Sequence, residues 1–189
     1  YLLGNLNDKF EDNGFEKLNI ENLPELEQFM LHKVYSLNNK FNNYFKNYDF
    51  HNLYKELLNF CTVDLSAFYF DIRKDTLYCD PINSVKRQSC IAVLNILLNS
   101  LLKWFAPILS FTTEEIYQLV SKKNKSIHLE NFIDFPSKFE NKKIAEKWSE
   151  LIKIRDICNI SIEEKRASKE IGSSLEAELN VKFNNKFKQ

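Results

Sequence analysis

Hydrophobic residues recur at steps of three and four along most of the chain, which is the spacing that one face of an α-helix requires. The first clear stripe follows Asn22-Leu-Pro-Glu25, where a capping Asn, a Pro in the first turn and an acidic residue mark a helix start. The stripe consists of Leu26, Met30, Val34, Leu37, Phe41, Tyr44 and Tyr48. It predicts a long amphipathic helix that extends from this start to about residue 48.

A second helical pattern begins near Phe50 and continues for more than twenty residues, with a candidate bend at residues 62–64. Its predicted apolar face holds Leu53, Leu57, Cys61, Leu65, Phe68 and Ile72, and Tyr69 is expected beside them. The pattern ends in Arg73-Lys-Asp-Thr76, a charged and turn-prone run that a simple amphipathic helix does not need.

The third pattern covers residues 85–105 and is apolar on nearly all sides, with Ser84 in position to cap its first turn and Pro107 to end it. Only a narrow polar strip of Asn95, Asn99 and Lys103 is predicted to face solvent. A helix of this kind belongs at the centre of a bundle, because nearly every side of it must be covered.

The second half of the chain predicts two more helices. Capping residues at Thr112 or Thr113 indicate a short one, and a long one is expected over residues 142–169, ended by Gly172. A polar connection over residues 121–141 separates them. Alternation over residues 176–183 is compatible with a single strand, for which the sequence offers no partner.

The predicted fold is therefore an all-α bundle of about five helices, with a single C-terminal strand as an option. We expect an incoming helix end and linker over residues 1–21, the bundle over residues 22–172, and the start of a C-terminal junction over residues 173–189. Because the chain opens with Tyr1 in place of Met, we expect it to be a fragment or a processed product.

Composition agrees with this fold class. Only three Gly and four Pro occur, which favours long helices over a sandwich or barrel with many tight turns. No apolar run approaches the roughly 20 residues that span a bilayer, so we expect no membrane partner. Four cysteines without a Cys-x-x-Cys pair predict free thiols in a reducing compartment, the cytoplasm, with an organelle as the alternative.

The residues that could carry catalysis do not cluster in the sequence. His32, His51 and His128 are isolated from one another and from cysteines, which argues against a metal site. Three glycines cannot build a phosphate-binding loop, and no serine stands in a Gly-x-Ser-x-Gly context. We therefore predict no catalytic residue, metal or cofactor within the chain.

The net charge is zero, but the charges are unevenly distributed. Residues 1–83 carry 8 basic against 13 acidic side chains, whereas residues 84–129 carry 6 against 2. The basic groups that could contact RNA phosphates are Lys86, Arg87, Lys122, Lys123, Lys125, Arg155, Arg166 and Lys169. Spacing predicts that Arg155, Arg166 and Lys169 share one side of the last helix, although a salt-bridged surface helix would show the same pattern.

Several blocks of sequence, taken in order, resemble one known family. They are Leu2-Leu-Gly-Asn-Leu6, Phe50-His-Asn-Leu-Tyr54, Phe60-Cys-Thr-Val-Asp-Leu-Ser-Ala-Phe-Tyr-Phe-Asp-Ile72 with Lys74-Asp75, Ala106-Pro-Ile-Leu-Ser-Phe-Thr-Thr-Glu-Glu-Ile116, Ser126-Ile-His-Leu129 and Lys169-Glu-Ile-Gly-Ser-Ser-Leu-Glu-Ala177. The chain is similar to the anticodon-binding domain of bacterial-type isoleucyl-tRNA synthetases. Synthetases for valine, leucine and methionine share the bundle, but the block over residues 64–75 is most similar to the isoleucine enzyme.

The resemblance implies a helix bundle that binds the anticodon stem-loop of isoleucine tRNA and is joined to a catalytic domain of the same parent chain. That domain would form isoleucyl-adenylate with ATP, and a zinc module would stand at the C-terminus of the parent; both lie outside this chain. Tyr117 and Phe132 depart from the Trp that the family pattern favours. A helical protein-interaction module that does not bind RNA is the alternative from another class.

Overall fold

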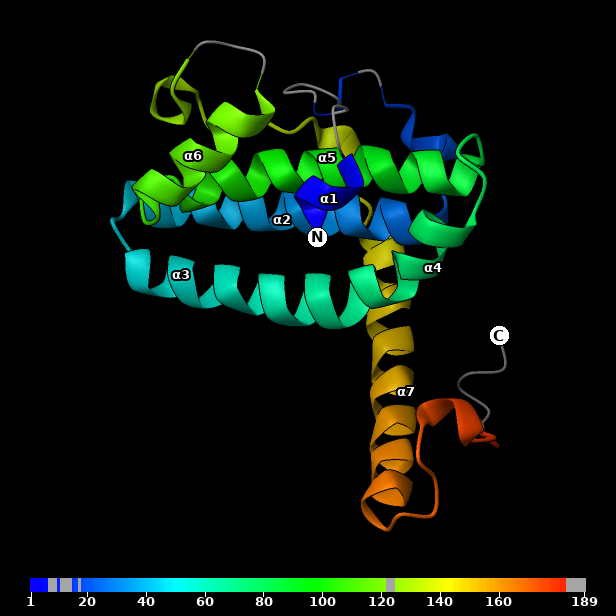
Figure 1. Ribbon diagram of the computed structural model, residues 1–189. Helices are drawn as coiled ribbons and strands as arrows, with labels where there is room; N and C mark the ends of the chain where they lie inside the picture. Colours follow the sequence, from blue (N-terminus) through cyan, green and yellow to red (C-terminus); the bar gives the residue numbers. More distant parts are fainter. Residues whose placement is uncertain (7–9, 11–14, 17, 122–124, 183–189) are drawn as a thin grey trace. The chain divides into compact units, whose positions relative to one another are not determined.

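The computed structural model describes residues 1–6, 10, 15–16, 18–121 and 125–182, which are drawn as ribbon in Figure 1. It divides into two compact units, residues 1–144 and residues 145–189. Over its described residues, the first unit contains six α-helices and the start of a seventh, with a π-helix (Phe60–Phe70) between α3 and α4. The α-helices are α1 (Leu2–Leu6), α2 (Glu25–Lys46), α3 (Phe50–Asn59), α4 (Asp71–Cys79), α5 (Val85–Phe105), α6 (Ser110–Val120) and the first turn of α7 (Lys142–Ala167). Short 3-10 turns lie at Ile20–Asn22, Ile127–Leu129 and Ser137–Phe139.

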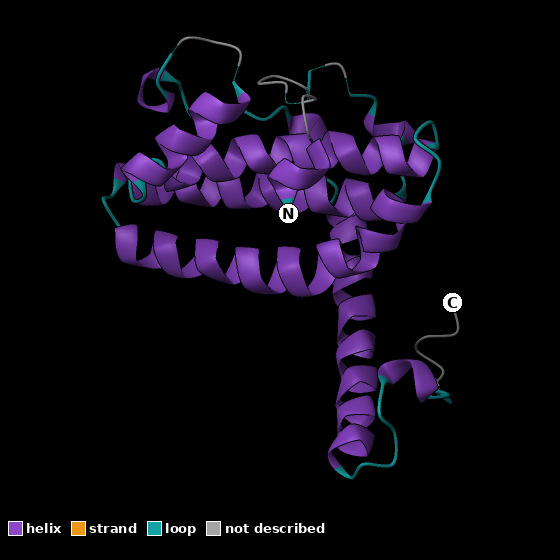
Figure 2. Cartoon of the chain, in the orientation of Figure 1, coloured by secondary structure: helices purple, strands orange, loops and turns teal. Residues whose placement is uncertain are grey.

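The second unit consists of the rest of α7 and a 3-10 turn at Ser174–Glu176. The described residues form helices, turns and loops and no β-strand (Figure 2), so the predicted all-α class is confirmed. The optional strand does not form over its described part, residues 176–182. An isolated extended segment has no neighbour with which to exchange backbone hydrogen bonds.

Helix α5 is the centre of the first unit, and its predicted bounds agree with the structure. It packs against α1, α2, α4 and α6, and in Figure 1 it runs beside α2, whose other side faces α3. The Ser84 hydroxyl accepts a hydrogen bond from the Arg87 amide at 3.1 Å and caps the helix as expected. By length and composition α5 could cross a membrane, but 72% of that apolar window is buried in the bundle. Its hydrophobicity is accounted for by its central position.

The polar strip of α5 is not exposed, and this prediction is wrong. Asn95, Asn99 and Lys103 are only 6%, 2% and 9% exposed to solvent. Helices pack around α5. Ile127 and His128, from the segment after α6, line the same pocket as Lys103. A helix surrounded in this way buries its polar side chains together with its apolar ones.

The second predicted helix is continuous, but its middle is a π-helix over Phe60–Phe70. A π-helix closes i→i+5 hydrogen bonds, so each of its turns holds more residues than an α-turn. Side chains after Leu57 are therefore shifted around the axis, and Phe60, Leu65 and Tyr69 are buried. Cys61 is only half-buried and Ile72 is 38% exposed, so both were wrongly assigned to the buried face.

The charged run Arg73–Thr76 is helical and belongs to α4, which corrects the expected turn. Arg73 is only 6% exposed, because its guanidinium forms an ion pair with the buried carboxylate of Glu27 on α2. The run looked turn-prone because a charged residue rarely occupies a helix face that packs into a core.

Candidate nucleic-acid interface

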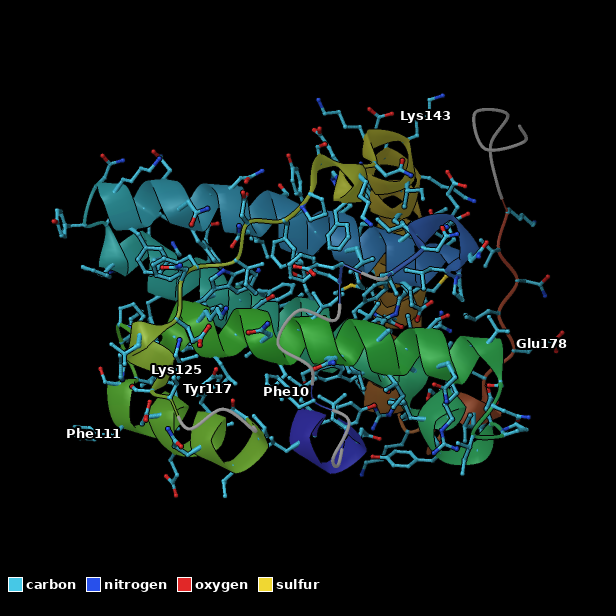
Figure 3. All side chains as sticks on the ribbon, turned by 90° about the horizontal axis from the view of Figure 1, so that it is seen from above. Phe10, Phe111, Tyr117, Lys125, Lys143 and Glu178 are labelled. Atoms are coloured by element: carbon cyan, nitrogen blue, oxygen red, sulfur yellow. The ribbon has the colours of Figure 1, made fainter. Side chains whose placement is uncertain are left out.

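The basic residues predicted to contact RNA lie in three groups. Lys86 and Arg87 are in the first turn of α5, Lys125 follows α6, and Arg155, Arg166 and Lys169 belong to the second unit. Lys122 and Lys123 lie outside the described residues. Helix α5 has 21 residues and is about 31 Å long. Lys86 lies at its N-terminal end, whereas Lys125 follows α6, which begins beyond the C-terminal end of α5 (Figure 3). They do not form one patch.

The two residues at the start of α5 differ in role. Lys86 is exposed, whereas Arg87 is half-buried and its Nη1 donates a hydrogen bond to the Asp80 carbonyl oxygen at 2.7 Å. Arg87 therefore ties α5 to the end of α4. Of this pair, Lys86 is the side chain that is open to solvent.

Lys125 is exposed, and Glu114 holds the two residues that follow it, Ser126 and Ile127. The Glu114 carboxylate accepts hydrogen bonds from the Ser126 hydroxyl at 2.8 Å, the Ile127 amide at 2.9 Å and the Gln118 side chain at 2.8 Å. Hydrogen bonds from Gln118 and Ser126 lower the pKa of this carboxyl. Glu114 therefore fixes the two residues that directly follow Lys125.

The C-terminal end of α7 brings two of the predicted residues together. Arg166 Nη1 pairs with Glu163 Oε1 at 2.6 Å, one turn earlier on the helix. Lys169 lies beyond the last helical residue, Ala167, with a left-handed φ of 59°. The prediction that Lys169 shares a side of the helix with Arg155 and Arg166 is therefore wrong. Lys169, and not Gly172, ends the helical path.

Arg166 and Lys169 both line an open hollow of about 520 Å³ within the second unit. Its other lining residues are Glu163, Ala167, Ile171 and Gly172. Glu163 and Ile171 were not among the predicted residues, because a carboxylate and an apolar side chain carry no sign of phosphate binding. The family block over residues 169–177 contains Ile171 and could have drawn attention to it, whereas no signal in the sequence marks Glu163.

The large aromatic side chains of the described residues range from fully buried to almost fully exposed. Trp104 is 1% exposed, donates from Nε1 to Asn38 Oδ1 at 3.0 Å and meets the Phe41 ring edge-on at 5.0 Å. Phe111 on α6 is the opposite case, since it is 93% exposed and points away from the bundle in Figure 3. This exposure was not predicted from the sequence.

The histidines have structural or surface positions. His32 Nδ1 accepts a hydrogen bond from the Asn141 amide at 2.9 Å, and Asn141 Oδ1 accepts one from the Ile144 amide at 3.1 Å. His32 thereby orients the residue that caps the start of α7. In the part of the chain that the structure describes, no three His, Cys, Asp or Glu side chains are grouped as metal ligands would be.

These features define a helical domain with basic side chains on its surface, of the class that tRNA synthetases carry. A family model for the anticodon-binding domain of tRNA ligase matches residues 27–181, and the chain belongs to this family. The matched domain is a non-catalytic part of such ligases.

The chain is similar to isoleucine–tRNA ligases. It is 70% identical over 184 residues to that of Pelagibacter ubique (strain HTCC1062), covering 97% of this chain and 20% of the ligase. The ligase of Bartonella quintana (strain Toulouse) is 41% identical over 86% of this chain and 17% of its own length. That of Agrobacterium fabrum (strain C58 / ATCC 33970) is 40% identical over 94% and 18%. The chain thus spans about a fifth of these relatives, and the family resemblance seen in the sequence is confirmed.

Proposed function

We propose that the chain binds the anticodon stem-loop of an isoleucine-accepting tRNA as part of an isoleucine–tRNA ligase. The observation that carries this proposal is the 70% identity to such a ligase over 97% of the chain, a stretch that overlaps residues 27–181, which match the anticodon-binding family. The ATP-dependent joining of isoleucine to tRNA would be performed by a catalytic domain of the same parent chain. The cytoplasm, or an organelle, is where this reaction would take place.

An anticodon loop can be bound by exposed cations together with a few side chains that stack on bases or form hydrogen bonds with their edges. Single-stranded loops present unstacked bases, which proteins bind by stacking and by edge hydrogen bonds, while Lys and Arg neutralise phosphates. Lys86, Lys125, Arg166 and Lys169 are exposed and suited to this role. Arg87 is engaged with the Asp80 carbonyl, which makes it a weaker candidate.

An apolar groove of about 340 Å³ supports contact with the rest of the parent chain. Its lining comes from α1, α5, α6 and Phe70, and includes Leu101, Phe105 and Ile116. Apolar surface of this kind is suited to burial against another protein segment and contributes little to phosphate binding. The relatives are several times longer than this chain, so the catalytic domain is the partner that we propose for this groove.

The RNA-binding proposal is tested by titrating the chain with a synthetic isoleucine anticodon stem-loop at two salt concentrations. Each phosphate contact contributes about −0.9 to −0.7 to the slope of log affinity against log salt, so three or four contacts predict a loss of about tenfold or more over a fourfold increase in salt. An affinity that does not change with salt would contradict phosphate binding. Equal affinity for heparin would contradict recognition of the stem-loop.

A further inference from the structure

We propose that the hollow at the C-terminal end of α7 holds one unstacked nucleotide of the anticodon loop, with its base against Ala167 and Ile171, its edge at Glu163 and Arg166, and its phosphate at Lys169. This inference rests on the proposed function and assigns it a place on the molecule. All of these residues lie within the second unit.

The size of the hollow suits one nucleotide. Its volume of about 520 Å³ falls within the range of about 300–1,000 Å³ that is typical of small-molecule sites. It is open to solvent, so a nucleotide could enter while remaining joined to the RNA on both sides. A closed cavity of the same volume would not allow this.

The lining supplies the three kinds of contact that a nucleotide requires. Ala167 and Ile171 give an apolar surface against which the face of a base can lie. The ion pair with Glu163 fixes the Arg166 guanidinium, while only one Arg166 nitrogen and one Glu163 oxygen take part in it. The remaining Arg166 donors and the second Glu163 oxygen can therefore form hydrogen bonds with the edge of a base. An exocyclic amine of the base would donate to the carboxylate.

Lys169 occupies a backbone position that normally favours glycine. The Lys169 amide donates to the Arg166 carbonyl at 3.0 Å, and the Glu170 amide donates to the Lys165 carbonyl at 3.0 Å. This is the hydrogen-bond pattern of a Schellman motif, whose left-handed residue is usually Gly because a side chain is disfavoured there. A lysine at this position holds its ammonium at the helix end, at the rim of the hollow.

The neighbouring charges leave the Lys169 charge uncompensated. Glu170, next in the chain, is paired with Lys165 at 2.6 Å and accepts a hydrogen bond from the Ser168 hydroxyl at 2.9 Å. Among the described residues Lys169 has no ion-pair partner. The lining therefore carries two cations, Arg166 and Lys169, against one carboxylate, Glu163, and is positive overall.

Two other hollows do not have this character. One of similar volume near the start of α2 contains Glu16 and Glu21 against a single Lys138, which would repel a phosphate. The groove around α5 and α6 is lined almost wholly by apolar side chains. The hollow at the end of α7 combines positive charge, a stacking surface and an edge acceptor.

The test compares the 189-residue chain with its Arg166→Met, Glu163→Gln and Lys169→Gly variants, using the isoleucine anticodon stem-loop and a series of RNAs with one abasic loop position each. For the unmodified chain, one abasic position is expected to weaken binding by about tenfold, the size of a lost base stack. Arg166→Met should weaken binding of the intact RNA by a similar factor. This variant should then bind the intact RNA and the RNA with that abasic position equally well. Glu163→Gln should weaken the intact RNA and leave the RNA with that abasic position unchanged.

Lys169→Gly should act differently, because it removes a phosphate contact. It should weaken all RNAs about equally and reduce the salt slope by about one. Lys153→Met is the matched control, since Lys153 is an exposed lysine of α7 that pairs with Glu150 and does not line the hollow. Its affinity and salt slope should match those of the unmodified chain. Helical content, measured by circular dichroism, should be the same in all variants.

Four results would decide against the proposal. If the Arg166→Met, Glu163→Gln and Lys169→Gly variants bind the stem-loop with unchanged affinity, the hollow is not the binding site. The same conclusion follows if the loss of affinity caused by Arg166→Met multiplies the loss caused by the sensitive abasic position. Either result would leave the proposed function in place. A Lys153→Met effect as large as that of Lys169→Gly would show a general charge effect and would also overturn the hollow as the binding site. Failure of the unmodified chain to bind any stem-loop at low salt would overturn the proposed function as well.

Discussion

Arg73 and Glu27 are joined by two hydrogen bonds in the core: Arg73 Nε donates to Glu27 Oε1 and Nη2 to Oε2, each at 2.6 Å. The Tyr69 hydroxyl lies 3.2 Å from Glu27 Oε1 and 3.5 Å from Cys90 Sγ. Burial raises the pKa of the Cys90 thiol to about 11 and that of Tyr69 well above its usual value. This network links α2, the π-helical stretch, α4 and α5.

Loss of one partner of this ion pair should be costly. Arg73→Met leaves the fully buried Glu27 carboxylate unpaired, and we expect it to lower the free energy of unfolding by about 3–5 kcal/mol. The double variant Glu27→Leu/Arg73→Met removes both charges and should recover most of that loss. Urea denaturation measures all three free energies. A single variant that loses less than about 1 kcal/mol would mean that water enters the site and relieves the charge.

His32 should make stability depend on pH. Burial is the main cause of its lowered pKa, with Glu140 opposing and Lys142 reinforcing the shift, and the protonated ring cannot accept the Asn141 amide. A folded-state pKa below the unfolded value of about 6.5 means that the unfolded chain binds the proton first as pH falls. The contribution of His32 is therefore complete above pH 6.5 and is lost as pH falls towards the folded-state pKa.

The measurement is the urea midpoint between pH 7.5 and pH 5.5 for the unmodified chain and for His32→Gln. On acidification, the urea midpoint of His32→Gln should fall less than that of the unmodified chain. His128→Gln is the control, because His128 is exposed, and it should retain the full decline. Equal pH profiles for the unmodified chain and His32→Gln would contradict the assigned role.

Lys169→Gly should stabilise the end of α7 although it weakens RNA binding. The left-handed conformation costs a residue with a side chain roughly 1–2 kcal/mol, which glycine avoids. Hydrogen exchange at the Glu170 amide, which bonds to the Lys165 carbonyl, should slow. Gly172→Ala is the contrast: its φ is not left-handed and its added methyl would meet Glu176 Oε1 at 3.4 Å, so it should give no such gain. Faster exchange in Lys169→Gly would show that the lysine side chain supports the turn.

Glu114→Ala should release Ser126 and Ile127, the residues that directly follow Lys125. The Ile127 amide loses its acceptor, so its hydrogen exchange should accelerate while the amides of α6 keep their protection. Glu115→Ala is the neighbouring control and should leave the Ile127 amide unchanged. Because hydrogen bonds lower the pKa of Glu114, the Ile127 amide should keep this protection on mild acidification and lose it only as that carboxyl becomes protonated. Unchanged exchange at Ile127 in Glu114→Ala would contradict the interaction.

Helices with strong local signals were predictable from the sequence. The bounds of α5 follow from the Ser84 cap and the apolar run before Pro107, both of which act locally. The π-helical stretch was not predictable, because periodicity alone assumes a regular helix and placed Cys61 on the buried face. The burial of Asn99 depends on which segments pack around α5, and that is a property of the tertiary structure.

The candidate site was predictable only in part. Charge and spacing pointed to Arg166 and Lys169, which do line one hollow. They also pointed to Arg87, whose guanidinium is engaged with the Asp80 carbonyl. Spacing cannot distinguish a cation that faces solvent from one that holds the backbone. The left-handed turn at Lys169 was missed because Gly172 carries the usual signal for a helix end.

The most direct test of RNA recognition is a competition between two hairpins with the same stem at the same salt concentration. One carries the isoleucine anticodon loop and the other a short tetraloop that offers no unstacked anticodon bases. Recognition of the loop predicts that the tetraloop hairpin binds at least about tenfold more weakly, because base contacts are lost and phosphate contacts to the stem remain. Equal affinity for the two hairpins would contradict the account.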